Sequence, residues 1–313
     1  MDIENDTGFP HFQFKKVGYY GELFTVVVVS QTFKLSYNNG RCLIADEQSP
    51  PVMVDSWYGE PELSSLKTST DLVCKKVRAD ILLNGHAWHP AGKVSQWQAE
   101  LQVGNLYRRF DVCGPREWRY TENIWQLSEP VITGQVPFRH ELALFSEYNP
   151  VGIFSSPQRH FDTKLSYPAP QLSTSPGAIC RSWPSRFRYA LGFTEEWQKT
   201  IHPFYPDEFD FAFMNYAPPE QQYDGYLKGN EKIVLKNLLP SRMTHTCYLP
   251  GIQIVACLYH RANEEPELRT LLADTLTIYT DDELLTLTWR LTLPANALPQ
   301  DIVLTTEQEV SYG

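Results

Sequence analysis

The segment at residues 285–293 alternates almost perfectly between apolar and polar residues, and it constrains the fold more than any other part of the chain. Four leucines and Trp289 occupy the odd positions, whereas three threonines and Arg290 occupy the even positions. A period of two places successive side chains on opposite faces of a β-strand. The pattern therefore predicts a strand whose leucines face a core and whose threonines and Arg290 lie on the other face.

Other segments combine β-branched and aromatic residues with turn residues at their ends. Residues 22–35 precede the turn Asn38-Asn39-Gly40, and the chain returns over residues 41–44, which predicts a hairpin. A second hairpin is predicted around Asp281-Asp282. Alternation at Trp97, Ala99, Leu101 and Val103 predicts one inward face. The predicted strands, besides those of the first hairpin, are residues 80–88, 94–103, 107–112, 232–239, 247–258, 276–279 and 284–293.

The middle of the chain lacks this periodicity and is rich in proline, serine and aromatic residues. Residues 194–201 predict a short helix with Thr194 as its N-cap. The aromatic residues need burial, so we expect an ordered irregular segment that wraps around the sheets. The predicted fold is mainly β: an antiparallel β-sandwich or paired β-sheets, with a long irregular segment and one or two short helices.

This pattern divides the chain into three predicted regions. Residues 1–145 form an N-terminal β-rich region, residues 146–229 form the irregular wrap, and residues 230–313 form a C-terminal β-rich region. The two β-rich regions can build one composite sandwich or two small domains, and the sequence leaves both arrangements open.

Charge and hydropathy exclude several classes of protein. The 313 residues contain 27 Lys plus Arg and 37 Asp plus Glu, a net charge of −10, which argues against a nucleic-acid-binding protein. No apolar run approaches the roughly 18 residues of a membrane helix, and the longest is Val26 to Val29. The N-terminus shows no signal peptide. We therefore expect a cytoplasmic protein that does not insert into membranes.

The cysteines and histidines form no recognised metal or nucleophile motif. No two cysteines are spaced as CxxC, so we expect buried thiols. His86 and His89 would point to opposite faces of a strand, and the pairs His160–Asp162 and His245–Cys247 carry no nucleophile motif. We expect no metal and no cofactor. The six cysteines are Cys42, Cys74, Cys113, Cys180, Cys247 and Cys257.

Two acidic clusters remain as candidates for acid–base chemistry. Asp207-Glu208-Phe209-Asp210 follows a proline, where aspartates usually cap turns, and Asp281-Asp282-Glu283 is expected to be a solvated hairpin tip. A glycosidase would need two carboxylates across a sugar cleft. No catalytic constellation stands out, so we expect a protein that is not an enzyme.

A series of short motifs appears in one order along most of the chain, from Thr32 to Arg290. In sequence letters, with the number of the first residue, they are TFK (32), ADEQ (45), DSWYGEP (55), SSL (64), STDL (69), GHA (85), GPREW (114), NPVG (149), RSWPSR (181), PDEFD (206), NYAPPEQQ (215), DTL (274) and WR (289).

This series resembles a bacterial domain-of-unknown-function family that is encoded in type VI secretion gene clusters, beside PAAR-repeat spike tips and toxic effectors. The resemblance implies an adaptor, or chaperone, that helps to load a cargo effector onto the VgrG–PAAR spike. The implied partners are an effector, bound through a PAAR or N-terminal region, and the spike itself. Pro115 departs from the family, which more often has an acidic residue before its arginine, and we do not expect the pentapeptide-repeat extensions that some relatives carry.

The motif residues either hold the fold or contact the partner. Gly59 and Gly85 suit tight turns, and Asp71, Asp207 and Asp210 suit turn caps. One alternative is a β-sandwich carbohydrate-binding module or hydrolase that uses Asp207, Asp210 and Trp183, and another is a structural component of the secretion machine. The candidate binding or fold-defining residues are Trp57, Gly59, Glu60, Ser64, Ser65, Asp71, Asn149, Pro150, Trp183, Asp207, Asp210, Pro218, Pro219 and Gln221.

Overall fold

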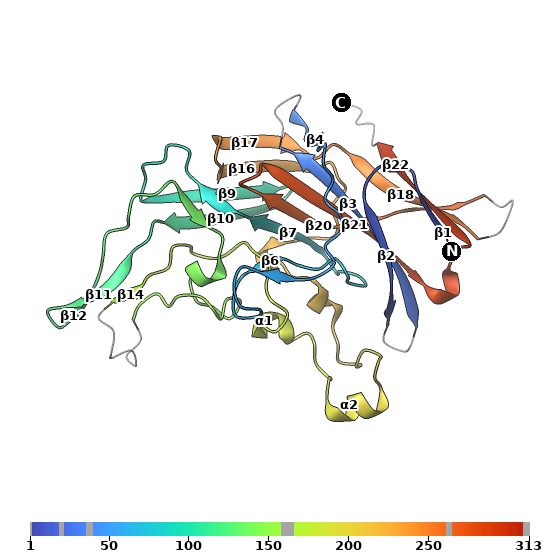
Figure 1. Ribbon diagram of the computed structural model, residues 1–313, viewed down its shortest axis with the longest axis horizontal. Helices are drawn as coiled ribbons and strands as arrows, with labels where there is room; N and C mark the ends of the chain where they lie inside the picture. The colour runs from blue at the N-terminus through green and yellow to red at the C-terminus, as the bar shows by residue number, and fades with distance from the viewer. Residues whose placement is uncertain (1, 19–21, 36–39, 158–165, 261–264, 309–313) are drawn as a thin grey trace.

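A seven-stranded mixed sheet forms the centre of the protein in a computed structural model (Figure 1). The structure describes residues 2–18, 22–35, 40–157, 166–260 and 265–308. The predicted Asn38-Asn39 turn and the pair His160–Asp162 lie outside these residues. In spatial order the strands are β15 (Gln222–Tyr223), β7 (Ala79–Asn84), β20 (Leu272–Tyr279), β21 (Leu284–Pro294), β3 (Leu23–Lys34) and β2 (His11–Val17), and β4 (Leu43–Ile44) also pairs with β3.

Strands from the two ends of the chain lie side by side in this sheet. β21, the strand with the strict alternation, pairs antiparallel with β3 over its full length, from Leu284 opposite Lys34 to Pro294 opposite Phe24. β20 and β21 form the predicted second hairpin, and β3 and β4 form the predicted first one. β7 and β20 run parallel, so the sheet is mixed.

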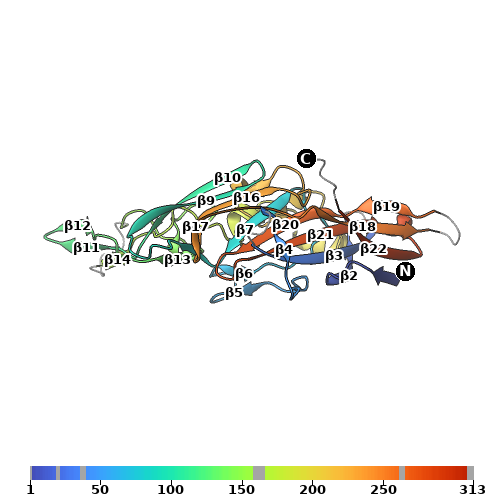
Figure 2. The ribbon, with the colours of Figure 1, turned by 90° about the horizontal axis from the view of Figure 1, so that it is seen from above.

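Two four-stranded sheets pack on one face of the central sheet, and Figure 2 shows β9, β10 and β16 in this second layer. Apolar side chains from all three sheets form the main core, which confirms a mainly β fold of paired sheets. One sheet contains β10 (Leu106–Cys113), β9 (Gln96–Val103), β16 (Lys232–Leu239) and β17 (Arg242–Tyr248). The other contains β1 (Asp2–Asn5), β22 (Asp301–Gln308), β18 (Ile252–Tyr259) and β19 (Glu267–Thr270).

Shorter elements complete the fold. A three-stranded sheet projects at one end of the molecule and contains β12 (Ile124–Leu127), β11 (Glu117–Thr121) and β14 (Ser166–Pro168) (Figure 1). Two strand pairs are β13 (Gln135–Pro137) with β8 (His86–Trp88), and β5 (Ser56–Trp57) with β6 (Leu66–Thr68). The helices are α1 (Pro184–Phe187) and α2 (Glu195–Thr200), and the described 3₁₀ helices are η2 (His140–Leu142), η3 (Phe211–Met214), η4 (Pro219–Gln221) and η5 (Ala295–Ala297).

Two predicted strands are each divided in the structure. Residues 80–88 split at Gly85, whose φ of +111° suits glycine, and β7 and β8 enter different sheets. Residues 247–258 split at Pro250-Gly251 into β17 and β18, again in different sheets. Proline cannot donate a ladder hydrogen bond, and Gly251 has a φ of +79°. The prediction of two continuous strands was wrong, because a local backbone effect breaks each apolar run, at Gly85 in the first and at Pro250-Gly251 in the second.

The opposite face of the central sheet is also buried. Val26 to Val29 are fully buried because Val27 and Val29 face the main core, whereas Val26 and Val28 pack against Phe209 and Phe211 of the middle segment. A strand covered on both faces explains the continuous valine run.

The middle segment is ordered and irregular over its described part, as predicted. Thr194 caps α2, since its side chain accepts a hydrogen bond from the Trp197 backbone N–H at 3.1 Å. Trp183, Phe209 and Phe211 are buried, but Phe187 is 53% exposed, so the expectation that every aromatic residue is covered was wrong. Among the described residues, no helix is both long and apolar enough to span a bilayer.

Candidate functional site

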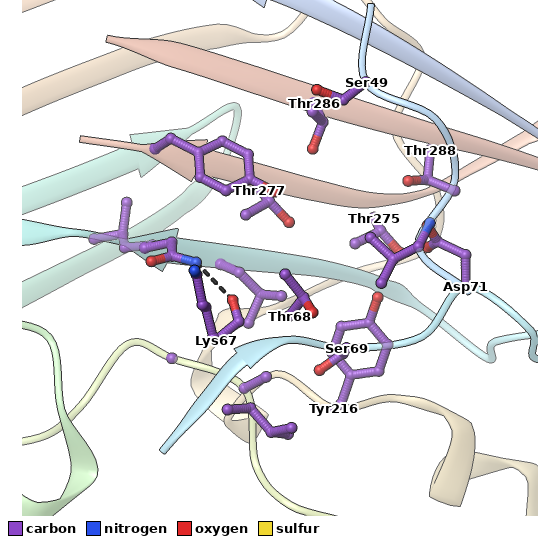
Figure 3. Close-up of a pocket in the computed structure, with 18 of the residues that line it drawn as sticks. Ser49, Lys67, Thr68, Ser69, Asp71, Tyr216, Thr275, Thr277, Thr286 and Thr288 are labelled. Carbon is purple, nitrogen blue, oxygen red and sulfur yellow. Dashed lines mark hydrogen bonds between the residues drawn. The ribbon is translucent and has the colours of Figure 1, made fainter. Parts of the chain in front are cut away.

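A small polar cavity lies between the second face of the central sheet and residues 49–71, which we call the strap (Figure 3). The sheet contributes threonines of β20 and β21, and the strap contributes Ser49, Thr68, Ser69 and Asp71. The cavity volume is about 70 Å³. A water molecule takes up roughly 30 Å³ in the liquid, so this strap cavity has room for about two waters and not for a sugar or a nucleotide.

Buried charges stand next to the strap cavity. Arg290 on β21 pairs with Asp274 on β20, with 2.5 Å between Nε and Oδ2, and both side chains are almost fully buried. Arg290 Nη1 also donates to the backbone carbonyls of Asp71 and Val73, at 2.7 and 2.8 Å. Arg290 lies on the polar face of β21, as the alternation predicts, and it fastens the strap to the sheet.

Asp71 is the strap residue closest to this arrangement. Its carboxylate accepts a hydrogen bond from the Val52 backbone N–H at 2.8 Å, which closes the two ends of the strap. Burial raises the pKa of Asp71, and the positive charge of Arg290 opposes that shift. Asp71 therefore acts as the turn-fastening residue that the sequence predicts.

A second buried ion pair joins Lys76 Nζ to Asp80 Oδ2 at 2.9 Å, and both side chains have no exposed surface. The Asp80 carboxylate also accepts hydrogen bonds from Asn215 Nδ2 (3.0 Å) and from the backbone N–H groups of Tyr216 (3.0 Å) and Ala217 (3.2 Å). Lys76 Nζ lies 3.6 Å from the centre of the Tyr216 ring. These contacts anchor the first residues of the NYAPPEQQ motif onto the sheet.

Several other candidate residues meet around His140, in what we call the His140 junction. Ser65 Oγ accepts a hydrogen bond from the His140 backbone N–H at 2.7 Å, and Ser65 also binds the Glu141 carboxylate. Asn149 Nδ2 donates to the His140 carbonyl at 2.8 Å, and the Trp183 ring meets the His140 ring edge-on at 4.8 Å. The junction joins four segments of the chain.

The loop at residues 59–64 completes this junction. Ser64 Oγ donates to the Glu60 carbonyl at 2.8 Å and accepts from the Gly59 N–H at 3.0 Å. Trp183 Nε1 donates to the Glu62 carbonyl at 2.9 Å. Gly59, Glu60, Ser64, Ser65, Asn149 and Trp183 are therefore brought together by hydrogen bonds and ring packing.

The remaining candidate residues are spread over the middle segment and the strap. Asp210 caps η3 by accepting from the Ala212 N–H at 2.8 Å, whereas Asp207 is exposed. Gln221 is fully buried and donates to the Ile81 and Pro176 carbonyls. Pro218 and Pro219 lie at the start of η4, and Pro150 is half-buried. Trp57 packs against the buried cluster that contains Trp183.

These positions bear on the carbohydrate alternative. The Trp183 ring is only 3% exposed, so it offers no open face on which a sugar could stack. Within the described residues, no group of three or more His, Cys, Asp or Glu side chains could hold a metal ion.

The acidic hairpin tip is exposed at Asp281 and Asp282, as expected, and its side chains also bind neighbouring residues. Asp281 stays exposed, but its carboxylate binds His86 Nδ1 and Trp88 Nε1, each at 2.8 Å. Glu283 forms an ion pair with Arg242. His89 does not share this contact with His86, and the centre of its ring lies 6.0 Å from the centre of the Trp97 ring.

His140 provides a pH-dependent readout of the junction. Burial lowers its pKa to about 4 from 6.5, so the folded protein keeps the ring neutral while the unfolded chain protonates it below pH 6.5. Folding stability should therefore fall as the pH drops from 6.5 toward 4, by about 2 kcal/mol at pH 5. We expect urea unfolding at pH 7 and pH 5 to show this loss in the wild type and a smaller one in His140→Gln. An equal loss in both proteins would contradict the assignment, and His202→Gln, at an exposed position, is the matched control.

Sequence reasoning missed a partly exposed row of aromatic residues on the projecting sheet and in the neighbouring segment. The ring of Trp125 lies 5.1 Å from Tyr120 and 5.3 Å from Tyr167. Next to them, a mainly apolar pocket of about 270 Å³ lies between Trp118, Phe154 and Tyr167, among other residues. Phe145 stacks on Phe154 at 4.3 Å. We call Trp118, Tyr120, Trp125, Phe145, Phe154 and Tyr167 the aromatic row.

A local signal could have found this sheet. The hairpin of β11 and β12 turns at Glu122 and Asn123, whose φ values are +52° and +64°. Two consecutive residues with positive φ are typical of a tight hairpin turn that favours asparagine, and aromatic residues alternate on both sides of it. Tyr120 and Phe154 are 38% and 40% exposed, so the row is accessible to a partner.

The comparison with family models connects this geometry to a known group. A family described as "Uncharacterized protein conserved in bacteria (DUF2169)" matches residues 21–290. The chain belongs to this family. The match to DUF2169 includes the strap, both buried ion pairs, the His140 junction and the aromatic row. No curated protein and no solved structure matched the chain.

Proposed function

We propose that this DUF2169 protein is a non-enzymatic adaptor that binds an effector of a type VI secretion system in the bacterial cytoplasm. It would hold the effector, through a PAAR or N-terminal region, and assist its loading onto the VgrG–PAAR spike. The ordered motif series supports this proposal, and the match to a bacterial family supports its bacterial setting.

The observation that carries the proposal is the exposed aromatic row. Aromatic side chains supply much of the binding energy in protein interfaces because they bury a large apolar area with few rotatable bonds. The row lies beside β12, which is an edge strand of its sheet. An edge strand can also add a partner strand through backbone hydrogen bonds.

The buried polar groups have structural partners, which suits a binding protein. Asp80, Asp274, Arg290 and Lys76 bind one another and the backbone of the covering segments. The strap cavity has room for about two waters, so it does not suit an organic substrate.

Affinity purification of the tagged protein from its own bacterium tests the proposal. We expect one effector or PAAR protein to co-purify near a one-to-one ratio, and deletion of the adaptor to abolish secretion of that effector. Effector loading and secretion that persist without the protein would contradict the proposal. If no partner is recovered, glycan-array binding and hydrolase assays would test the alternative.

The aromatic row gives this test a residue-level form. Tyr120→Ala and Phe154→Ala should each weaken the complex about 30-fold, since loss of an aromatic hot spot costs roughly 2 kcal/mol or more. Phe187→Ala is the matched control, because Phe187 is 53% exposed on α1, outside the row. Titration calorimetry with the purified partner measures the affinities of the wild type and of the three variants. Equal affinities for all variants and the wild type would place the interface elsewhere.

A further inference from the structure

Two cysteines that are 205 residues apart in sequence meet in the core. Cys42 Sγ lies 3.3 Å from Cys247 Sγ, and the two residues are 2% and 0% exposed. A disulfide needs an S–S distance of about 2.05 Å, so the sulfur atoms have to approach by about 1.2 Å. Side-chain rotation can supply such a movement without a change of fold.

The backbones at these positions are held next to each other. The Cys42 N–H donates to the Tyr248 carbonyl at 2.8 Å, and Arg41 forms a parallel bridge with Tyr248. Arg41 Nη1 also donates to the Pro250 carbonyl at 3.3 Å. Cys247 is paired with Ile233 of β16 on its other side. The contact between the sulfur atoms therefore follows from hydrogen-bonded neighbours and not from a chance approach of two loops.

The surroundings favour ionisation of one of the two thiols. The hydrogen bond from Cys42 lowers the pKa of Cys247, with help from His245 and Arg242, while burial opposes the shift. The same contact and burial raise the pKa of Cys42. The contact therefore favours ionisation at Cys247 over Cys42, which suits a nucleophile with a resolving cysteine.

Three other buried cysteines lack this arrangement. Burial raises the pKa of Cys74 to about 11 and the pKa of Cys180 to about 12. Burial also raises the pKa of Cys113. These side chains remain thiols at neutral pH and fit the expected role of small buried hydrophobes. Cys257, on β18, is half-buried.

We propose that Cys42 and Cys247 are a site of reversible oxidation, at which a small peroxide converts the two thiols into a disulfide. The Cys247 thiolate attacks one peroxide oxygen, the O–O bond breaks, and hydroxide leaves and takes up a proton as water. The Cys42 sulfur then attacks the resulting sulfenic acid, loses its proton, and displaces a second water as the S–S bond forms. Two thiols and one hydrogen peroxide thus give one disulfide and two waters.

The oxidised protein would differ from the reduced protein in where it forms and in its stability. Cytoplasmic thiols are kept reduced, so the disulfide would form under peroxide stress or outside the reducing cytoplasm. It would join the chain before β4 to β17 and restrict the unfolded state. The oxidised protein should therefore unfold at a higher urea concentration than the reduced protein.

Thiol counting with peptide mapping tests the proposal on the full-length protein. After treatment with hydrogen peroxide, alkylation in denaturant should find four thiols in place of six, and digestion should yield one Cys42–Cys247 peptide that dithiothreitol separates. Six remaining thiols would overturn the proposal. A disulfide between other cysteines, or oxidation of Cys257 with Cys42 and Cys247 unchanged, would overturn it as well.

Two substitutions sharpen the result. Cys257→Ser should still lose two thiols to the disulfide, because Cys257 lies outside the pair. Cys42→Ser should lose the cross-linked peptide and the shift in the urea midpoint, and Cys247 should be oxidised to a sulfenic acid that dimedone labels in denaturant. A Cys42→Ser protein that keeps the midpoint shift on oxidation would contradict the assignment. The mapping of wild-type protein decides the question even where a substitution impairs folding.

Discussion

Replacing Arg290 with methionine is expected to lower the free energy of unfolding by about 3–5 kcal/mol. The substitution leaves the Asp274 carboxylate buried without its counter-charge, 2.5 Å from where Arg290 Nε had been. It also removes the donor for the Asp71 and Val73 carbonyls, so the strap loses its attachment to the sheet. Urea denaturation of the purified variant measures the change.

Two further proteins separate charge burial from a general effect of substitution. The double variant Arg290→Met with Asp274→Leu should recover part of the loss, because it leaves no unpaired buried charge. Asp46→Asn breaks an exposed ion pair with Lys34 and should cost at most about 1 kcal/mol. If Arg290→Met and Asp46→Asn were equally stable, the buried pair would not have the role assigned to it.

Asp80→Asn is expected to lower the free energy of unfolding by a similar amount, about 3–5 kcal/mol, although it only replaces one carboxylate oxygen with an NH₂ group. Asp80 Oδ1 accepts from Asn215 Nδ2 and the Ala217 N–H, and Oδ2 accepts from Lys76 and the Tyr216 N–H. Either orientation of the asparagine amide would direct its NH₂ group at two donors. Lys76 would also keep its charge in a fully buried site.

The readout combines urea denaturation with limited proteolysis of the segment that Asp80 anchors. We expect faster cleavage near Tyr216 in Asp80→Asn, because three hydrogen bonds that hold this segment are weakened together. Asp111→Asn is the control, since Asp111 is an exposed strand residue that accepts from Gln98, and it should change stability by about 0.5 kcal/mol or less. Unchanged proteolysis in Asp80→Asn would contradict the anchoring role.

The candidate residues show how far motif reasoning extends. Gly59, Ser64, Ser65, Asn149 and Trp183 lie in four separate motifs, and the structure joins them around His140. His140 itself belongs to none of the quoted motifs. Its role depends on contacts among segments that are distant in sequence, and no local pattern contains that information.

The aromatic row was missed for a different reason. Its β11–β12 hairpin carries an adequate local signal in its turn and its alternating aromatic residues. Whether those rings are buried or exposed depends on what else packs against the hairpin. The same residue types at Phe209 and Phe211 are buried beneath the central sheet.

The sequence by itself determined several long strands and their inward faces, because a period of two is a local property of the chain. β3, β9 and β21 lie where alternation or β-branched residues predict them, and the Thr194 cap of α2 follows from one side chain and its own helix. Only the tertiary structure decided that both faces of the central sheet are covered. Arg290 has a polar position in the pattern of β21, yet it is 3% exposed, because the strap that buries it lies more than 200 residues earlier in the chain.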